Sequence, residues 1–148
     1  NVGVHGRVNK LGVPSFVFSR EEFIAGVPIL EKLAEYDVCL IVLAGFMNKI
    51  SDVILQAFPG KIVNIHPALL PKYGGKGMYG MHVHEAVVKA GERESGITIH
   101  YINEHYDEGA IIFQASCPVL PSDTPEEVAS KVHALEYAHY PHVIESLL

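Results

Sequence analysis

The chain has few cysteines, few basic residues and no long hydrophobic run, and each shortage excludes a class of protein. Two cysteines in 148 residues, Cys39 and Cys117, are too few for a disulfide framework. Both lie within apolar runs, so we expect them to be core thiols of a protein from a reducing compartment. The longest apolar run, residues 38–47, is much shorter than the roughly 20 residues that a membrane-spanning helix needs.

Basic residues are outnumbered, with 11 Lys and Arg against 17 Asp and Glu and a formal charge of −6. Proteins that bind nucleic acids or anionic membranes rely on clustered Lys and Arg, so we expect neither kind of partner. A small anionic substrate held by a local site is compatible with this charge. The chain opens without a signal peptide, which predicts a cytoplasmic protein, and without an initiator Met, which predicts an incomplete N-terminus.

Hydrophobic residues make up 49% of the chain and charged residues 19%, a composition that supports a packed core and excludes disorder. The length suits one domain, and neither a repeat nor a linker divides residues 1–148. Apolar periodicity predicts helices over residues 1–11, 20–35 with a break at 28, 52–58, 84–90, and 125–148 with a break or kink at 141. Ser19 and Glu22 are spaced as a capping box for the second of these helices. Strands are predicted over residues 14–18, 38–44, 61–66, 97–102 and 110–115.

Strands that alternate with helices predict an α/β fold with a doubly wound, mainly parallel sheet. The apolar run VCLIVLA, residues 38–44, does not alternate with polar residues, which is typical of a strand covered on both faces. Sheets of this kind bind ligands at the carboxyl ends of their strands. Residues 45–49, 64–67 and 103–107 lie at or just after strand ends and are therefore the first candidates for a site.

Three polar residues in these segments are suited to act together. Asn64 and His66 are two apart at the end of a strand, so both side chains share one face. Asp107 would meet His66 if the two strand ends are neighbours. An Asn amide and an imidazolium both donate hydrogen bonds to a developing oxyanion, and a carboxylate would orient the imidazole and raise its pKa. This set predicts acyl transfer to an amine substrate, with no Ser or Cys nucleophile.

A structural interpretation of the same residues stays open. Asn64 can cap a turn, His66 can be an ordinary histidine at the sheet rim and Asp107 can begin a loop; spacing alone favours this interpretation.

Three other motifs give weaker evidence for a functional site. The run GGKG lacks the Ser or Thr that follows Lys in a phosphate-binding loop. The histidine pair in the run HVH is too small a ligand set for zinc, and Cys117 has no evident catalytic partner.

The segment NIHPALLPKY, residues 64–73, closely resembles the signature of the folate-dependent formyltransferases. The resemblance extends, in order along nearly the whole chain, to LAGFM at 43–47, GITIH at 96–100, DEGAII at 107–112 and EYAHYP at 136–141. It implies the formyltransferase fold, and within the family it points to the enzymes that formylate glycinamide ribonucleotide in purine synthesis. The implied reaction transfers a formyl group from 10-formyltetrahydrofolate, a consumed co-substrate, to the amine of glycinamide ribonucleotide, with no metal.

The resemblance also implies roles for individual residues. His66 would be the catalytic acid that stabilises the oxyanion, Asn64 would hold the formyl oxygen, and Asp107 would raise the pKa of His66 and organise a proton-relaying water. Besides Asn64 and Asp107, the implied folate pocket contains Arg20, Met47, Asn48, Lys49, Ile50, Asn103, Glu104, His105 and Tyr106. Glycinamide ribonucleotide would be bound by His133, Ala134, Leu135 and Glu136, with Glu136 on its ribose hydroxyls.

Three features depart from the family pattern. Asn48 stands where the family usually has Arg, with Lys49 as the neighbouring cation. The stretch at residues 74–81 is longer than is usual in the family. The strand, helix and strand that open the family fold, with a loop that binds the substrate phosphate, have no counterpart in this sequence. We therefore expect a single formyltransferase domain that is incomplete at its N-terminus.

Other functions stay open at this stage. Formyltetrahydrofolate deformylase and methionyl-tRNA formyltransferase share this core, but the first normally carries an N-terminal regulatory domain and the second a C-terminal domain. A non-catalytic folate-binding module is a further alternative for a truncated domain. The sequence does not decide the oligomeric state, and a homodimer is among the states it allows.

Overall fold

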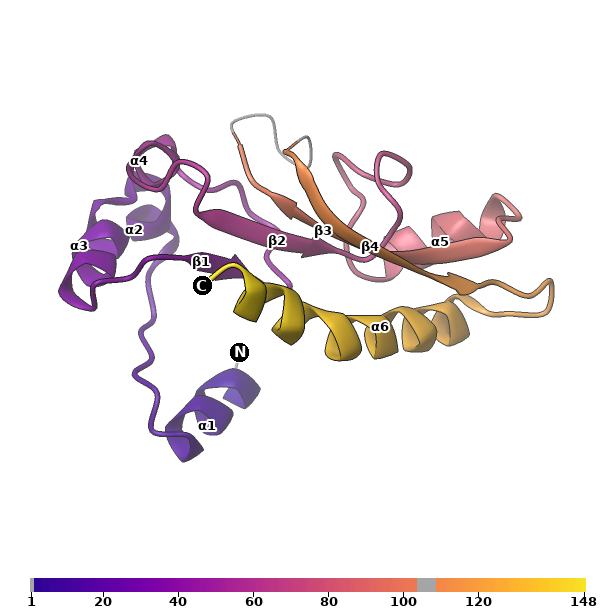
Figure 1. The fold of residues 1–148 in the computed structure, drawn as a ribbon, viewed down its shortest axis with the longest axis horizontal. Helices are drawn as coiled ribbons and strands as arrows, with labels where there is room; N and C mark the ends of the chain where they lie inside the picture. Colours follow the sequence, from indigo (N-terminus) through magenta and orange to yellow (C-terminus); the bar gives the residue numbers. More distant parts are fainter. Residues whose placement is uncertain (1, 104–108) are drawn as a thin grey trace.

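The computed structural model describes residues 2–103 and 109–148, which form a four-stranded sheet flanked by helices (Figure 1). The strands lie in the order β1 (Ile41–Leu43), β2 (Ile62–His66), β3 (Glu94–Tyr101) and β4 (Ile111–Pro118). The helices are α1 (Val2–Lys10), α2 (Arg20–Ala25), α3 (Val27–Glu35), α4 (Asp52–Ala57), α5 (Met81–Lys89) and α6 (Pro125–Ser146). Helix α6 runs along the sheet, α2, α3 and α4 gather near β1, and α1 lies apart from the sheet (Figure 1). The chain thus has the α/β fold that its element order predicts.

Local sequence signals set the helix ends. At α2, the Ser19 hydroxyl accepts a hydrogen bond from the Glu22 amide (3.1 Å), and the Glu22 carboxylate accepts one from the Ser19 amide (2.7 Å), which confirms the capping box. Gly26 ends α2 with a φ of +79°, and a Cβ at this position would collide with the Ser51 hydroxyl, so only glycine fits. Pro28 lies in the first turn of α3, where its missing amide hydrogen has no helical partner to lose. None of the helices in the described ranges is long and apolar enough to cross a membrane.

The sheet is mixed, so the prediction of a mainly parallel sheet is wrong. Strands β1 and β2 pair in parallel, whereas β2 with β3 and β3 with β4 pair antiparallel. Only residues 102–110 connect β3 to β4. A parallel pair needs a crossover of a dozen or more residues, so this short connection permits only the antiparallel arrangement.

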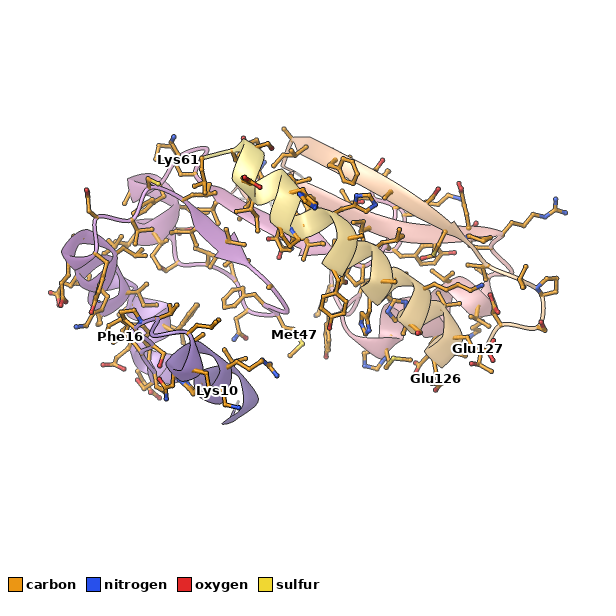
Figure 2. The ribbon with its side chains drawn as sticks, turned by 60° about the horizontal axis from the view of Figure 1, so that its bottom comes forward. Lys10, Phe16, Met47, Lys61, Glu126 and Glu127 are labelled. Carbon is orange, nitrogen blue, oxygen red and sulfur yellow. The ribbon has the colours of Figure 1, made fainter. Side chains whose placement is uncertain are left out.

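Two further expectations from local signals are wrong. Residues 14–18 form no strand, and Phe16 instead packs its ring against Tyr36, with 5.5 Å between the ring centroids. Helix α6 is continuous from Pro125 to Ser146 (yellow in Figure 2), so the expected break at Pro141 is wrong, whereas the alternative of a kink stays a prediction. Tyr140 beside Pro141 is buried in the core and holds this part of the helix on the sheet. Tertiary packing therefore overrides local preference in both segments.

The edge of the sheet at β1 is more exposed than its sequence predicts. Strand β1 is three residues long and pairs only with β2 among the described strands, which leaves Val42 38% exposed. The expected burial of residues 38–44 on both faces is therefore wrong. Cys39 is exposed and is not a core thiol, whereas Cys117 is half-buried against the core as expected.

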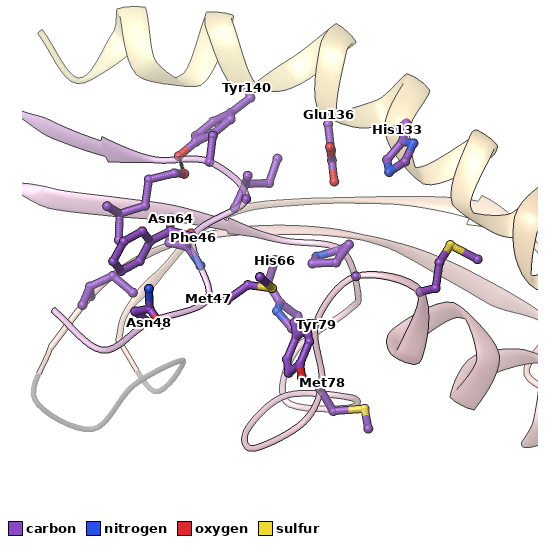
Figure 3. Close-up of a pocket in the computed structure, with 18 of the residues that line it drawn as sticks. Phe46, Met47, Asn48, Asn64, His66, Met78, Tyr79, His133, Glu136 and Tyr140 are labelled. Atoms are coloured by element: carbon purple, nitrogen blue, oxygen red, sulfur yellow. Dashed lines mark hydrogen bonds between the residues drawn. The ribbon is translucent and has the colours of Figure 1, made fainter. Parts of the chain in front are cut away.

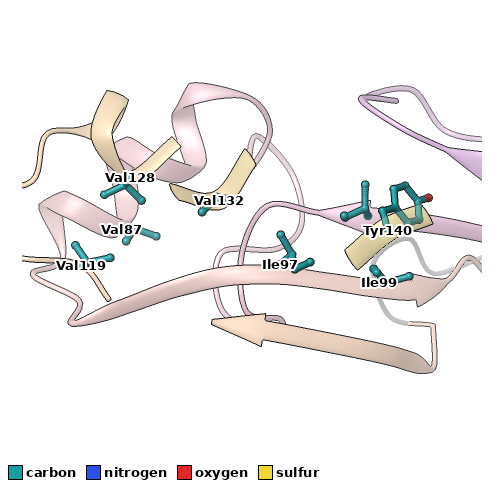
Figure 4. Packing of buried hydrophobic residues seen from close by; sticks show 8 residues of the cluster. Val87, Ile97, Ile99, Val119, Val128, Val132 and Tyr140 are labelled. Carbon is teal, nitrogen blue, oxygen red and sulfur yellow. The ribbon is translucent and has the colours of Figure 1, made fainter. Parts of the chain in front are cut away.

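Two hydrophobic clusters lie on opposite faces of the sheet. Side chains alternate along a strand, so Ile62 and Ile65 project from opposite faces of β2. The first cluster joins the sheet to α5 and α6 and contains Ile65, Val87, Ile97, Ile99, Val119, Val128, Val132 and Tyr140 (Figure 4). The second cluster, near α4, contains Ile50, Ile54, Ile62 and Ile102. Asn64 and His66 share the face of Ile62 and therefore project away from the first cluster.

Replacement of Ile97 by Ala tests the first cluster. Ile97 is fully buried, so the substitution should lower the free energy of unfolding by roughly 2–5 kcal/mol. Ile24→Ala is the matched control because Ile24 is 69% exposed, and its effect should stay within about 0.5 kcal/mol. Urea unfolding followed by circular dichroism measures both values. Equal effects of the two substitutions would contradict the packing of β3 against α6.

Candidate functional site

Two polar side chains face each other near the centre of the sheet. The strand register pairs Asn64 of β2 with His100 of β3, and Asn64 Nδ2 lies 3.4 Å from His100 Nε2. The other ring nitrogen of His100, Nδ1, lies 3.1 Å from the carbonyl oxygen of Tyr101, which can only accept a hydrogen bond. His100 Nδ1 therefore carries the hydrogen, and His100 Nε2 accepts one from the Asn64 amide. Both side chains are buried, so this contact sets the direction in which the Asn64 amide points.

His66, two residues further along β2, is held by the loop that follows the strand. Its Nε2 atom lies 2.7 Å from the backbone carbonyl oxygen of Tyr73. Because a carbonyl oxygen only accepts hydrogen bonds, Nε2 is the donor and carries the hydrogen. The second ring nitrogen, Nδ1, is then the basic atom of the neutral imidazole. His66 can therefore take up or release a proton through Nδ1.

The loop between β2 and α5 is attached to the sheet by side chains of β3 and β4. The hydroxyl of Thr98 accepts a hydrogen bond from the Leu70 amide (3.0 Å) and donates one to the Ala68 carbonyl (2.7 Å). Gln114 of β4 donates to the Leu70 carbonyl at 3.0 Å. Thr98 lies opposite His66 in the register. The β2–β3 pair thus positions both His66 and the loop that holds it.

Asn64 and His66 line a cavity of about 1100 Å³ that lies between the strand ends, two loops and α6 (Figure 3). The loop between β1 and α4 supplies Phe46, Met47, Asn48, Lys49 and Ile50, and the loop and helix after β2 supply residues that include Met78, Tyr79 and His84. Helix α6 supplies His133, Glu136, Tyr137 and Tyr140, whose spacing of three and four residues is that of one helix face. Segments far apart in the sequence therefore surround one cavity.

Tyr140 joins α6 to β1 at this cavity. Its hydroxyl donates a 2.6 Å hydrogen bond to the carbonyl of Leu43, across 97 positions of sequence. Burial, and then the carboxylate of Glu136, raise the pKa of Tyr140 well above its usual range, so the phenol keeps the proton that it donates. The contact ties the C-terminal half of α6 to the strand that leads into the cavity wall.

Titratable groups around the cavity influence one another. His84 is almost fully buried, and its Nδ1 atom has no hydrogen-bond partner among the described residues. Burial lowers the pKa of His84, and repulsion from His133 and His66 lowers it further. Burial raises the pKa of the Glu136 carboxyl, and the nearby His133 opposes that shift. Both His84 and Glu136 are therefore biased towards their neutral forms.

The structure brings together eight of the twelve predicted site residues that it describes. Among the described residues, Asn64, His66, Met47, Asn48, Lys49, Ile50, His133 and Glu136 all line the cavity. Three others, on α2 and α6, do not. Arg20 is exposed at the start of α2, Ala134 is exposed, and Leu135 packs against the first hydrophobic cluster. Positions 134 and 135 fall on other faces of α6 because a helix turns by about 100° per residue.

The remaining predicted residues belong to the connection between β3 and β4. Asn103 lies two residues after β3 and does not line the cavity as described, although Ile102 beside it does. Glu104, His105, Tyr106 and Asp107 lie outside the described residues. The meeting of Asp107 with His66 therefore stays a prediction.

Several residues of the site escape reasoning from the sequence. Tyr137 and Tyr140 follow His133 at helical spacing, so a helix-face argument could have found them. His100 could not be found in this way, because its place opposite Asn64 depends on strand register.

The two histidines of the HVH run in helix α5 differ in their surroundings, since His82 is exposed and His84 is buried. Over residues 2–103 and 109–148, no group of three or more His, Cys, Asp or Glu side chains is arranged to hold a metal ion.

Comparison with known proteins identifies relatives over nearly the whole chain. The family described as Formyl transferase matches residues 2–144. The chain is 42% identical over 141 residues to the chloroplastic phosphoribosylglycinamide formyltransferase of Arabidopsis thaliana, a match that covers 92% of this chain and 48% of that protein. It is 39% identical over 146 residues to the phosphoribosylglycinamide formyltransferase of Bacillus subtilis, covering 96% of this chain and 72% of that protein. The chain thus spans about half the length of the plant relative.

Solved structures share the fold. Glycinamide ribonucleotide transformylase 1 from Geobacillus kaustophilus superposes with a TM-score of 0.88 at 36% identity, over 98% of this chain and 77% of that one. A formyltetrahydrofolate deformylase from Pseudomonas syringae gives a TM-score of 0.83 at 19% identity, over 95% of this chain and 47% of the other. This second likeness extends to the fold alone.

Replacement of His133 by Gln tests the electrostatic coupling in the cavity. Because His133 lowers the pKa of both His84 and Glu136, its removal should raise both values. NMR titration of the His84 imidazole and of a ¹³C-labelled Glu136 carboxyl measures them. His142→Gln is the control, since His142 is exposed and lies outside the cavity wall, and it should move neither pKa. Unchanged values in the His133→Gln variant would show that the three groups do not share one environment.

Proposed function

The chain belongs to the formyl transferase family, and on that basis we propose that it transfers a formyl group from 10-formyltetrahydrofolate to the amine of glycinamide ribonucleotide in purine synthesis. One observation carries the proposal: Asn64 and His66 line the same cavity as residues 47–50 and Glu136. Donors for a developing oxyanion therefore lie beside the segments to which the two substrates are assigned. The whole reaction would take place within this cavity.

The proposed chemistry uses Asn64 and His66 as hydrogen-bond donors. The substrate amine attacks the formyl carbon, and the formyl oxygen becomes an oxyanion. One N–H of the Asn64 amide is turned towards His100, and the other is assigned to this oxygen. Protonated His66 donates to Tyr73 through Nε2 and to the oxyanion through Nδ1. When the bond from the formyl carbon to the folate nitrogen breaks, the amine has lost a proton and the folate nitrogen has gained one.

Asp107 is proposed as the third catalytic group. A carboxylate beside His66 would raise the pKa of the imidazole and so increase the protonated fraction near neutral pH. It would also hold a water molecule that relays the proton from the amine to the folate nitrogen. Ile102 lines the cavity, and Asp107 follows it by only five positions in the chain, which supports this assignment.

The cavity is large enough for two substrates. Its volume of about 1100 Å³ exceeds the roughly 300–1000 Å³ of pockets that hold one drug-sized ligand. We assign the folate ring to residues 47–50 and 103–107, the acidic tail of the donor to Lys49, and the ribose hydroxyls of the acceptor to Glu136. Arg20, Ala134 and Leu135 lie outside the cavity wall, and their contacts with the substrates stay predictions.

An assay with and without the acceptor tests the proposed function. The protein should release tetrahydrofolate from 10-formyltetrahydrofolate only when glycinamide ribonucleotide is present, with formation of the formylated ribonucleotide. Absorbance of the folate and mass spectrometry of the product follow the two events. Release of formate without the acceptor would indicate a deformylase, and folate binding without turnover would indicate a binding module; either result would overturn the proposal.

Replacement of His66 by Ala tests the catalytic assignment. Loss of a positioned general acid should lower kcat by about 10²- to 10⁴-fold, while the affinity for a folate analogue should change little because residues 47–50 are intact. Steady-state kinetics and calorimetric titration measure the two quantities. His142→Ala is the control, since His142 is exposed and outside the cavity. A collapse of folate affinity with His66→Ala would make His66 a binding residue.

A further inference from the structure

Tyr73 links His66 to a carboxylate outside the cavity. Its backbone carbonyl accepts the hydrogen bond from His66 Nε2 at 2.7 Å, and its hydroxyl donates to Glu92 Oε1 at 2.9 Å. Neither Tyr73 nor Glu92 lines the cavity. The three residues therefore form a hydrogen-bonded series that begins at the cavity wall and ends behind it.

The backbone of Tyr73 needs support from its surroundings. Its φ is +56°, in the left-handed region that residues with bulky side chains rarely adopt. Such a conformation is strained and persists only where other contacts hold it. The ring of Tyr73 packs against the first hydrophobic cluster, and its hydroxyl is held by Glu92. Both contacts act on the side chain, and together they fix the position of the backbone carbonyl.

Glu92 is placed as a fixed anchor for this hydroxyl. It follows the end of α5, where its amide donates to the Val87 carbonyl at 3.3 Å, and it precedes β3 by two residues. Its Oε1 atom accepts hydrogen bonds from both Tyr73 and Lys72, the second at 3.2 Å. The hydrogen bond from Tyr73, and to a smaller extent the one from Lys72, lower the pKa of Glu92 below its usual range. The carboxylate is therefore ionised at neutral pH. Its side chain is only 25% exposed, whereas that of Lys72 is 68% exposed.

We propose that Glu92 is a positioning residue for His66 in the formyl transfer described above, on which this inference rests. Glu92 holds the Tyr73 hydroxyl, and this contact keeps the Tyr73 carbonyl directed at Nε2 of His66. The carbonyl in turn fixes the ring so that Nδ1 points to the oxyanion. Glu92 acts through two successive hydrogen bonds and does not line the cavity. Its loss should therefore slow the chemical step and leave substrate binding unchanged.

Kinetics of two variants test this role. Tyr73→Phe removes the hydroxyl and keeps the ring, and Glu92→Ala removes the carboxylate. Each should lower kcat by roughly tenfold to a hundredfold, because a misplacement of about 1 Å costs that much, and KM should stay within about twofold. The double variant should lose no more of kcat than the more impaired single variant. Both substitutions remove the same hydrogen bond, between the Tyr73 hydroxyl and the Glu92 carboxylate. Lys72→Met removes the other partner of Glu92 and should leave kcat unchanged.

The ring nitrogens of His66 give a second measurement that does not require activity. At a pH high enough for the imidazole to be neutral, ¹⁵N NMR of the parent protein should show the tautomer with hydrogen on Nε2. In Tyr73→Phe and Glu92→Ala, the spectrum should move towards a mixture of both tautomers. If the parent protein has no formyl transfer activity but the two variants still shift the tautomer of His66, the proposed function is refuted. The positioning of the His66 ring by Glu92 is then retained. Folded variants with the parental tautomer and kcat, or strictly additive losses in the double variant, would overturn the inference.

Discussion

The register of β2 against β3 is the constraint on which the site depends. Side chains alternate between the two faces of a strand, so a shift of one residue would move every polar group of β2 to the opposite face. The observed register places Asn64 opposite His100 and His66 opposite Thr98. These buried side chains find their hydrogen-bond partners on β3 and on the following loop, and each polar group left unsatisfied would cost about 1–3 kcal/mol. The contacts that stabilise the centre of the sheet therefore also orient the side chains of Asn64 and His66.

Much of the local structure could be predicted from the sequence. The Ser19 capping box and the break before Pro28 depend on residues a few positions apart, and both are found in the structure. The strand that ends in NIHP and the placement of Asn64 and His66 at a ligand-sized cavity follow from the period of a strand and from the proline that ends it.

Features that depend on long-range pairing could not be predicted. The direction of β3 and β4 is set by how the chain returns to the sheet, and the exposure of Val42 is set by the edge position of β1. The contact of His100 with Asn64 and the hydrogen bond from His66 to Tyr73 require the strand register and the loop path, which no spacing rule contains. Family resemblance carried the assignment of His133 and Glu136, and helix geometry then separates them from their neighbours Ala134 and Leu135 on α6.

The hydrogen bond from Tyr140 to Leu43 also has a consequence for biosynthesis. The ribosome releases the chain from its N-terminus, so the segment around residue 43 emerges about a hundred residues before its partner on α6. Residues 43–50 therefore lack their contact with Tyr140 until translation has passed position 140. Because domains generally fold as units during synthesis, this wall is completed only when α6 leaves the exit tunnel, and nascent chains arrested earlier than that would lack the cavity.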